Sequence, residues 1–338
     1  MEEQQQQEWE SELAENLESL HQTGRRRGIK TTSLIITGAH VRKGPTKVLV
    51  SGNCIGNYDG SSATRIYDCE KRKFTRGPHM EQPRCKHSSV TLPDGNVAIF
   101  AGFSHHHRII ARCEIFDAKT NTFSSIGNMG FPAGGIAAVL LLNGLVFISG
   151  GVVRRGNTNT CQLYDPVTKT FRILTATLPH AMQGHSASLL PNGKVLICGG
   201  SIFSGWLPIG FEGMAYTYIY DPDTDTFGYG PNMQYKRRFH TATTLLDGRI
   251  LITGGGVLSS STSTTEIYDP WRNIFVLGPR MTKAREGHFA TLLPDGKVFI
   301  GGGDLGDRSS DTFDPQTNTF SQANPPFVRL EYASASLF

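Results

Sequence analysis

The chain has 338 residues, of which 33 are Lys or Arg and 29 are Asp or Glu, so only 18% are charged. With 38 Gly and 17 Pro, the composition favours many short strands joined by tight turns over long helices. No apolar run approaches the roughly 18 residues of a membrane-spanning helix, and the acidic N-terminus is unlike a secretory signal peptide. The six cysteines show neither CxxC pairs nor zinc-ligand spacing, so we expect reduced thiols in a cytoplasmic protein.

Residues 1–28 differ in kind from the rest of the chain. Residues 1–20 hold seven Glu and no Lys or Arg, which leaves 33 basic against 22 acidic residues in the remainder. Spacings of four, four and three predict an apolar stripe along one face of a helix, made of Trp9, Leu13, Leu17 and Leu20. The glycine at 24 and the three arginines after it predict a helix end and a basic linker. Two interpretations stay open: a helix docked on the chain's own body, or one that binds a partner or self-associates.

A turn dipeptide recurs through the rest of the chain. Five copies follow one another at steps of 49, 49, 55 and 48 residues: Asp94-Gly95, Asn143-Gly144, Asn192-Gly193, Asp247-Gly248 and Asp295-Gly296. Asn-Gly and Asp-Gly accept the positive φ angles of a tight hairpin. An apolar strand follows each copy, and Lys47–Val50 is a sixth such strand. Because these strands are apolar on both faces and run into glycines, they are predicted to be buried where backbones approach closely.

A second signature is a pair of aromatic residues seven positions apart, with Asp after the first member. It occurs six times, at Tyr67/Phe74, Phe116/Phe123, Tyr164/Phe171, Tyr220/Phe227, Tyr268/Phe275 and Phe313/Phe320. The pattern predicts a strand, an Asp-capped turn and another strand. Each repeat is therefore a unit of four strands. Such a sheet hides both of its faces only when neighbouring sheets pack around a common axis.

The tandem glycines, the spaced aromatics and the period of about 48 residues resemble kelch repeats, from about residue 31 to 338. The hairpins are most similar to those of galactose oxidase-like and bacterial kelch propellers. The resemblance implies an all-β propeller over residues 29–338, with six four-stranded blades, after the short N-terminal helix. The tail at 329–337 resembles the first strand of a blade, yet Thr31–Thr37 also looks like the first strand of blade 1. Either the ring has an extra strand, or the tail begins a missing seventh blade; we favour six blades.

The sequence carries no recognisable catalytic motif. It has no GxSxG, GxxxxGK[ST] or HExxH, and the glycines at 301, 303 and 306 precede a predicted strand instead of a helix. His105–His107 is expected to be an exposed loop tip, because adjacent histidines do not converge on one metal ion. Four histidines recur at equivalent positions and are expected to be structural: His87, His185, His240 and His288. Nothing matches the copper centre of galactose oxidase, so we predict no catalytic residue, metal or cofactor.

Binding is the remaining route to function. In kelch propellers, the loops between second and third strands and those between blades form one rim around the central channel. In this chain the rim loops supply a candidate partner-binding set rich in Arg and aromatics, as hot spots are: Tyr58, Arg84, Arg108, Arg154, Arg155, Trp206, Phe211, Arg238, Arg285, Asp304 and Arg308. The favoured hypothesis is a scaffold that captures an acidic segment of another protein. The alternative is a sugar- or small-acid-directed enzyme, similar to kelch-fold mutarotases and lyases; nucleic acid is disfavoured because the basic residues are dispersed.

Overall fold

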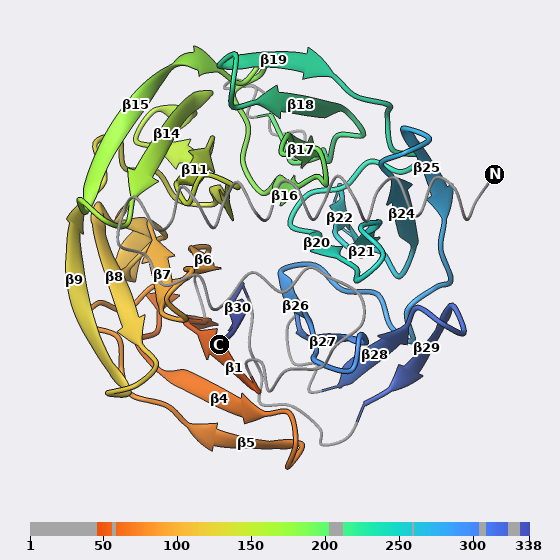
Figure 1. Cartoon of the computed structure of the whole chain (residues 1–338), viewed down its shortest axis with the longest axis horizontal. Helices are drawn as coiled ribbons and strands as arrows, with labels where there is room; N and C mark the ends of the chain where they lie inside the picture. The colour runs from red at the N-terminus through yellow and green to blue at the C-terminus, as the bar shows by residue number, and fades with distance from the viewer. Residues whose placement is uncertain (1–45, 56–58, 203–211, 259, 304–308, 324–331) are drawn as a thin grey trace.

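The computed structural model describes residues 46–55, 59–202, 212–258, 260–303, 309–323 and 332–338. Within these ranges the chain forms six four-stranded antiparallel sheets that radiate from one axis (Figure 1). This confirms the predicted six-bladed all-β propeller. The only helical segment among the described residues is the 3-10 turn η1 (His105–His107). The stripe predicted for the N-terminal helix (Trp9, Leu13, Leu17 and Leu20) lies outside the described residues.

The four strands of each blade follow one another outward from the axis, and they are named in that order. Blade 1 contains β30 (Ser334–Leu337), β1 (Lys47–Ser51), β4 (Thr64–Asp68) and β5 (Lys73–Arg76). Blade 2 contains β6 (Ser88–Thr91), β7 (Val97–Phe100), β8 (Arg112–Asp117) and β9 (Thr122–Asn128). Blade 3 contains β10 (Ala137–Leu140), β11 (Val146–Ser149), β14 (Thr160–Asp165) and β15 (Thr170–Thr177).

Blades 4 to 6 repeat the same order. Blade 4 contains β16 (Ser186–Leu189), β17 (Val195–Cys198), β18 (Thr217–Asp221) and β19 (Thr226–Tyr229). Blade 5 contains β20 (Thr241–Thr244), β21 (Ile250–Thr253), β24 (Thr265–Asp269) and β25 (Ile274–Leu277). Blade 6 contains β26 (His288–Leu292), β27 (Val298–Gly302), β28 (Ser310–Asp314) and β29 (Thr319–Gln322). Three two-stranded hairpins join second and third strands: β2 (Cys54–Ile55) with β3 (Asp59–Gly60), β12 (Val152–Val153) with β13 (Gly156–Asn157), and β22 (Gly256–Val257) with β23 (Ser260–Ser261).

The core lies between the blades, where the second strands and the paired aromatics meet. Strands β7, β11, β17 and β21 are buried along their whole length, as their two-sided apolar pattern predicts. Tyr67 lies opposite Phe74 in the β4–β5 ladder, and its ring stacks on Phe299 of blade 6 at 5.1 Å between centroids. The Asp-capped turn is also present, since Asp117 Oδ1 accepts backbone N–H bonds from Lys119 and Thr120 at 2.8 and 2.9 Å. The aromatic signature therefore fastens each blade to the one before it.

The C-terminal strand closes the ring. β30 pairs with β1 from Val48↔Leu337 to Ser51↔Ser334 and takes the innermost position of blade 1. It also contacts blade 2, because Ser334 Oγ lies 2.6 Å from Ser89 Oγ. β1 is paired with β4 on its other edge. β30 therefore occupies the first-strand position of blade 1 that the sequence predicted for residues 31–37. The alternative of a seventh blade is wrong: the tail completes blade 1 and removes the open edges that an unsealed ring would leave.

Candidate partner-binding rim and axial hollow

A closed ring of backbone hydrogen bonds surrounds the propeller axis. It uses one residue from the segment that enters each innermost strand, all with positive φ: Lys86, Gly135, Gly184, Phe239, Gly287 and Tyr332. Each N–H donates to the carbonyl of the preceding member, and Lys86 closes the circuit onto Tyr332, with distances of 2.7 to 3.1 Å. We call these six residues the axial ring. It fixes all six blades at one end of the axis.

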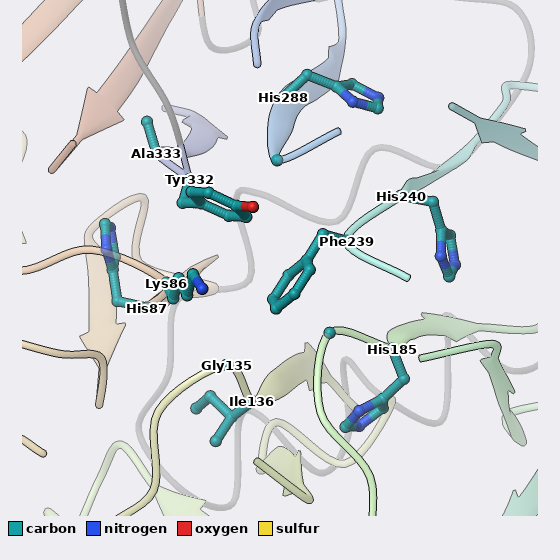
Figure 2. A pocket seen from close by; sticks show the side chains of 12 residues that line it. Lys86, His87, Gly135, Ile136, His185, Phe239, His240, His288, Tyr332 and Ala333 are labelled. Carbon is teal, nitrogen blue, oxygen red and sulfur yellow. The ribbon is translucent and has the colours of Figure 1, made fainter. Parts of the chain in front are cut away.

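A hollow of about 120 Å³ opens at the axial ring. Figure 2 shows the side chains of Lys86, Phe239 and Tyr332 pointing toward one another near its centre. The Lys86 ammonium lies 4.7 Å from the Phe239 ring centre and 4.5 Å from that of Tyr332, within cation–π range. Burial lowers the pKa of Lys86, because the charged amine loses water. This lysine was not among the predicted rim residues, although its place one residue before the recurring His87 marks it.

Glycine at the other ring positions leaves room for these rings. A Cβ at Gly287 would lie 2.6 Å from Tyr332 Cε1, and one at Gly184 would lie 2.8 Å from Phe239 Cδ1. Neither distance is compatible with a side chain there. The axial hollow is therefore shaped by three large side chains and three glycines in one ring.

The four recurring histidines fasten adjacent blades, which confirms their predicted structural role. Each Nε2 bonds a hydroxyl of the preceding blade at 2.9 Å: His87 to Ser51, His185 to Ser149, His240 to Ser186 and His288 to Thr253. The partner is a side chain, where the sequence suggested a backbone group. Blade 2 ends its second strand with Phe100 instead of a hydroxyl residue, and blade 3 correspondingly carries Ile136 in place of histidine. Blade 4 also ends its second strand without a hydroxyl, at Cys198, and His240 bonds Ser186 of the first strand instead.

Burial keeps these imidazoles neutral. It lowers the pKa of His87 and His288 to about 3 and that of His185 to about 4, with nearby arginines adding to the effect at His87 and His288. The pKa of His240 is also well below its ordinary value, mainly because of burial. Within the described part of the chain, the Nδ1 atoms of all four histidines have no hydrogen-bond partner. The four side chains line the wall of the axial hollow (Figure 2).

Two residues of the predicted rim prove to be structural. Arg84 and Arg285 are fully buried, where the sequence placed them at the surface. Arg84 Nη2 lies 2.5 Å from Glu114 Oε1, and Arg285 Nε lies 3.6 Å from Asp311 Oδ2. Arg237, which was not among the predicted residues, pairs in the same way with Glu266 at 3.1 Å. The signal was present in the sequence as an Arg three residues before a recurring histidine, followed 26 to 30 residues later by an acid in the third strand.

The remaining described rim residues surround the axial ring. Isolated bridges tie the rim loops to the residues just before ring members, with Cys85 to Phe103, Gly134 to Val152 and Arg238 to Gly256. Arg154 and Arg155, at the tip of the β12–β13 hairpin, are exposed, as is Arg108. Arg238 is mostly buried and its Nε lies 3.1 Å from Glu286 Oε1. The other predicted members lie outside the described residues: Tyr58, Trp206, Phe211, Asp304 and Arg308.

The histidines, cysteines and acids of the described ranges do not assemble into a metal site. These ranges contain no cluster of three such side chains able to hold a metal ion, and His105–His107 is exposed. None of the six cysteines, all of which lie within the described residues, forms a disulfide. Burial raises the pKa of Cys113 to about 11 and that of Cys161 to about 12, so these thiols stay protonated. Among the same residues, no helix has the length and apolar character needed to span a membrane.

Comparisons with known proteins point to one type of repeat. The family model of the Kelch motif matches residues 237–282, which contain Arg237, Phe239, His240 and all of blade 5. Alpha-scruin of Limulus polyphemus is 24% identical over 225 residues, covering 62% of this chain and 23% of scruin. Kelch-like protein 23 of Mus musculus is 25% identical over 221 residues, covering 65% of this chain and 37% of that protein. The chain thus spans between about a quarter and somewhat over a third of the length of these relatives.

A solved structure shares the architecture. The structure described as "Structure of YjhT" superposes with a TM-score of 0.65, at 13% sequence identity, over 76% of this chain and 88% of that one. At this identity the superposition shows the fold alone. It agrees with the six radial sheets found in the described residues.

Proposed function

Because this chain is a kelch-repeat β-propeller, a type of protein that typically binds other proteins, we propose that it is a non-catalytic interaction scaffold. Its rim would hold a partner over the axial hollow. The observation that carries this proposal is the exposed arginine group at Arg108, Arg154 and Arg155, in loops packed next to the axial ring. We call these three residues the rim arginines.

The charge balance of the rim favours an acidic partner segment. The carboxylates of Glu114, Glu266 and Asp311 are buried and paired with buried arginines, so they present no negative charge to a partner protein. None of the rim arginines forms an ion pair with a described carboxylate, whereas Arg238 has Glu286. Lys86, whose pKa is lowered by burial, lines the axial hollow beside these loops. Complementary charge of this kind speeds association and selects partners more than it adds raw affinity.

The N-terminal segment extends the proposal. Residues 1–20 carry seven Glu and the predicted apolar stripe, which suit a helix that aids assembly or self-association. We place the protein in the cytoplasm, where its six cysteine thiols would stay reduced. The enzyme alternative predicted Arg, His and Glu converging at one rim. Among the described residues, the buried Arg and His side chains instead fasten the blades, so no observation favours that alternative.

Charge reversal on the rim tests the proposal. The probe is a fluorescent ten-residue peptide of alternating Glu and Gly, titrated by anisotropy at low and physiological salt. Arg154→Glu/Arg155→Glu is expected to weaken binding about tenfold, since reversing two contacting charges removes at least ~1.4 kcal/mol. The matched control is Lys119→Glu/Lys169→Glu, which makes the same charge change in exposed turns at the other end of the strands.

Two outcomes decide the test. A control variant that weakens binding as much as the rim variant would reduce the effect to net charge and contradict a rim site.

Affinity purification with the full chain and with a chain lacking residues 1–28 tests the assembly role of the N-terminal segment. Loss of self-association in the shorter chain is the expected result, and unchanged association would remove that part of the proposal.

A further inference from the structure

The outer edge of blade 5 differs from that of every other blade. β25 forms the outermost strand, and among the described residues it pairs only with β24. Its sequence Ile-Phe-Val-Leu contains no polar residue. Sheets normally protect such an edge with charged or polar side chains, because its free N–H and C=O groups invite another strand. The edge of β25 lacks this protection.

The ladder registers allow a position-by-position comparison of the six outer strands. Ile274 stands opposite Asp269, and the equivalent residues of the other blades are polar: Lys73, Thr122, Thr170, Thr226 and Thr319. Val276 stands opposite Ile267, and its equivalents are polar or glycine: Thr75, Ser124, Arg172, Gly228 and Ser321. Blade 5 alone replaces both positions with β-branched apolar residues. The change is therefore specific to this edge and is not a property of the repeat.

The two apolar residues continue a buried row out to the surface. Ile267 belongs to the core between blades 5 and 6, together with Val298 and Phe313. Val276 lies directly opposite Ile267 and therefore on the same face of the sheet. Ile274 and Val276 are 41% and 42% exposed, and Leu277 is 55% exposed. An added strand would extend this row, covering apolar side chains that water now contacts.

We propose that β25 takes up an extended segment of a partner protein as a fifth strand of blade 5. The segment has β-branched or other apolar residues at alternate positions, because one face of the new strand meets Ile274 and Val276. It carries Asp or Glu at its ends. Arg280, just past one end of β25, is exposed, and the Arg272 side chain before the other end is 68% exposed, with Asp269 at 3.9 Å.

A second copy of the chain fits this edge poorly. In a two-fold antiparallel pair centred on Val276 of both copies, Arg272 of one chain stands directly opposite Arg280 of the other. Like charges so placed oppose association. A four-residue strand also covers far less than the roughly 800 Å² per partner of a standard interface. An acidic-ended segment avoids the charge repulsion and needs no large interface of its own.

The test uses defined peptides and hydrogen exchange. The probe is a seven-residue peptide with Val at alternate positions, Thr between them and Glu at both ends; a second peptide has Lys at both ends. We expect the Glu-ended peptide to slow amide exchange in β25 and to bind at least fivefold more tightly than the Lys-ended peptide. Ile274→Thr/Val276→Thr should weaken that binding at least tenfold. Thr fits the edge of a blade, since β9, β15, β19 and β29 begin with it.

Matched variants make the result specific. Val167→Thr/Ile173→Thr removes two exposed apolar residues from blade 3 and should leave binding unchanged. Arg154→Glu/Arg155→Glu should also leave it unchanged, which separates this edge from the rim. Equal binding by the Ile274→Thr/Val276→Thr variant would overturn the proposal. A dimer in sedimentation that this variant dissociates, without peptide binding to the parent chain, would overturn it in favour of a second copy.

Discussion

Replacement of Arg84 tests the buried ion pair of an arginine that was predicted to lie at the surface. Arg84→Ala leaves Glu114 as an unpaired buried carboxylate that still accepts N–H bonds from Glu81 and Gln82 at 2.6 and 3.1 Å. Breaking a buried pair in this way costs about 3 to 5 kcal/mol. The carbonyls of Ala101 and Arg112 lose their guanidinium donors as well. We therefore expect a large loss in the free energy of unfolding.

Blade 3 shows which second substitution should restore part of the lost stability. It carries Ala133 and Gln162 at the equivalent positions, and the Gln162 amide accepts from Phe131 N at 2.9 Å and donates to Phe131 O at 2.7 Å. Arg84→Ala/Glu114→Gln recreates this neutral arrangement in blade 2. With no charge left buried, the loss should fall to about 1 to 2 kcal/mol, the cost of the two carbonyls without donors.

Urea unfolding at pH 7.5, with the slope checked for two-state behaviour, measures both variants. The reasoning requires the double variant to be more stable than Arg84→Ala by about 2 kcal/mol. A double variant no more stable than the single one would show that Arg84 contributes through packing alone. The pairing of buried charges would then contribute nothing measurable to stability at this site.

Two further predictions concern the axis. The pKa of each histidine that fastens two blades is lowered on folding, so below about pH 6.5 the unfolded chain binds more protons than the folded one. Stability present above pH 6.5 is therefore lost as the pH falls, by up to ~1.4 kcal/mol per pH unit for each histidine. The variant His185→Ile, which copies Ile136 of blade 3, should reduce the slope of the free energy of unfolding against pH, measured in urea between pH 6.5 and 5. A parent chain whose stability does not change over this range would contradict the prediction. In the axial ring, Gly287→Ala and Gly135→Ala both place alanine at positive φ, but the nearest atom to a new Cβ lies at 2.6 Å in the first case and 3.5 Å in the second. Gly287→Ala should cost about 1 to 3 kcal/mol more than Gly135→Ala in thermal or urea unfolding, and equal losses would exclude the Tyr332 contact as the cause.

Much of the fold could be predicted because its determinants are local. An Asp-Gly or Asn-Gly turn, a buried apolar strand and an Asp after an aromatic each specify a few neighbouring dihedrals, and six copies of the pattern leave little choice of architecture. The candidate site was less accessible to this reasoning. Exposure of an arginine depends on what approaches it from another blade, so Arg84 and Arg285 were placed on the surface although carboxylates from third strands enclose them. The two aromatic rings in contact with Lys86 belong to Phe239 and Tyr332, which are far from it in sequence.

The sequence by itself determined the repeat unit, the number of blades and the absence of a recognisable catalytic motif. The tertiary structure decided how the ring closes, because β1 accepts a partner from either end of the chain until the axial ring brings Tyr332 between Gly287 and Lys86. It also decided that the apolar Val276 lies on an outer edge, since only the sheet order places β25 outermost in blade 5. The physical reason is the same in both cases. Local turns fix the strands, whereas closure, burial and exposed edges arise from contacts between blades that sequence neighbours do not share.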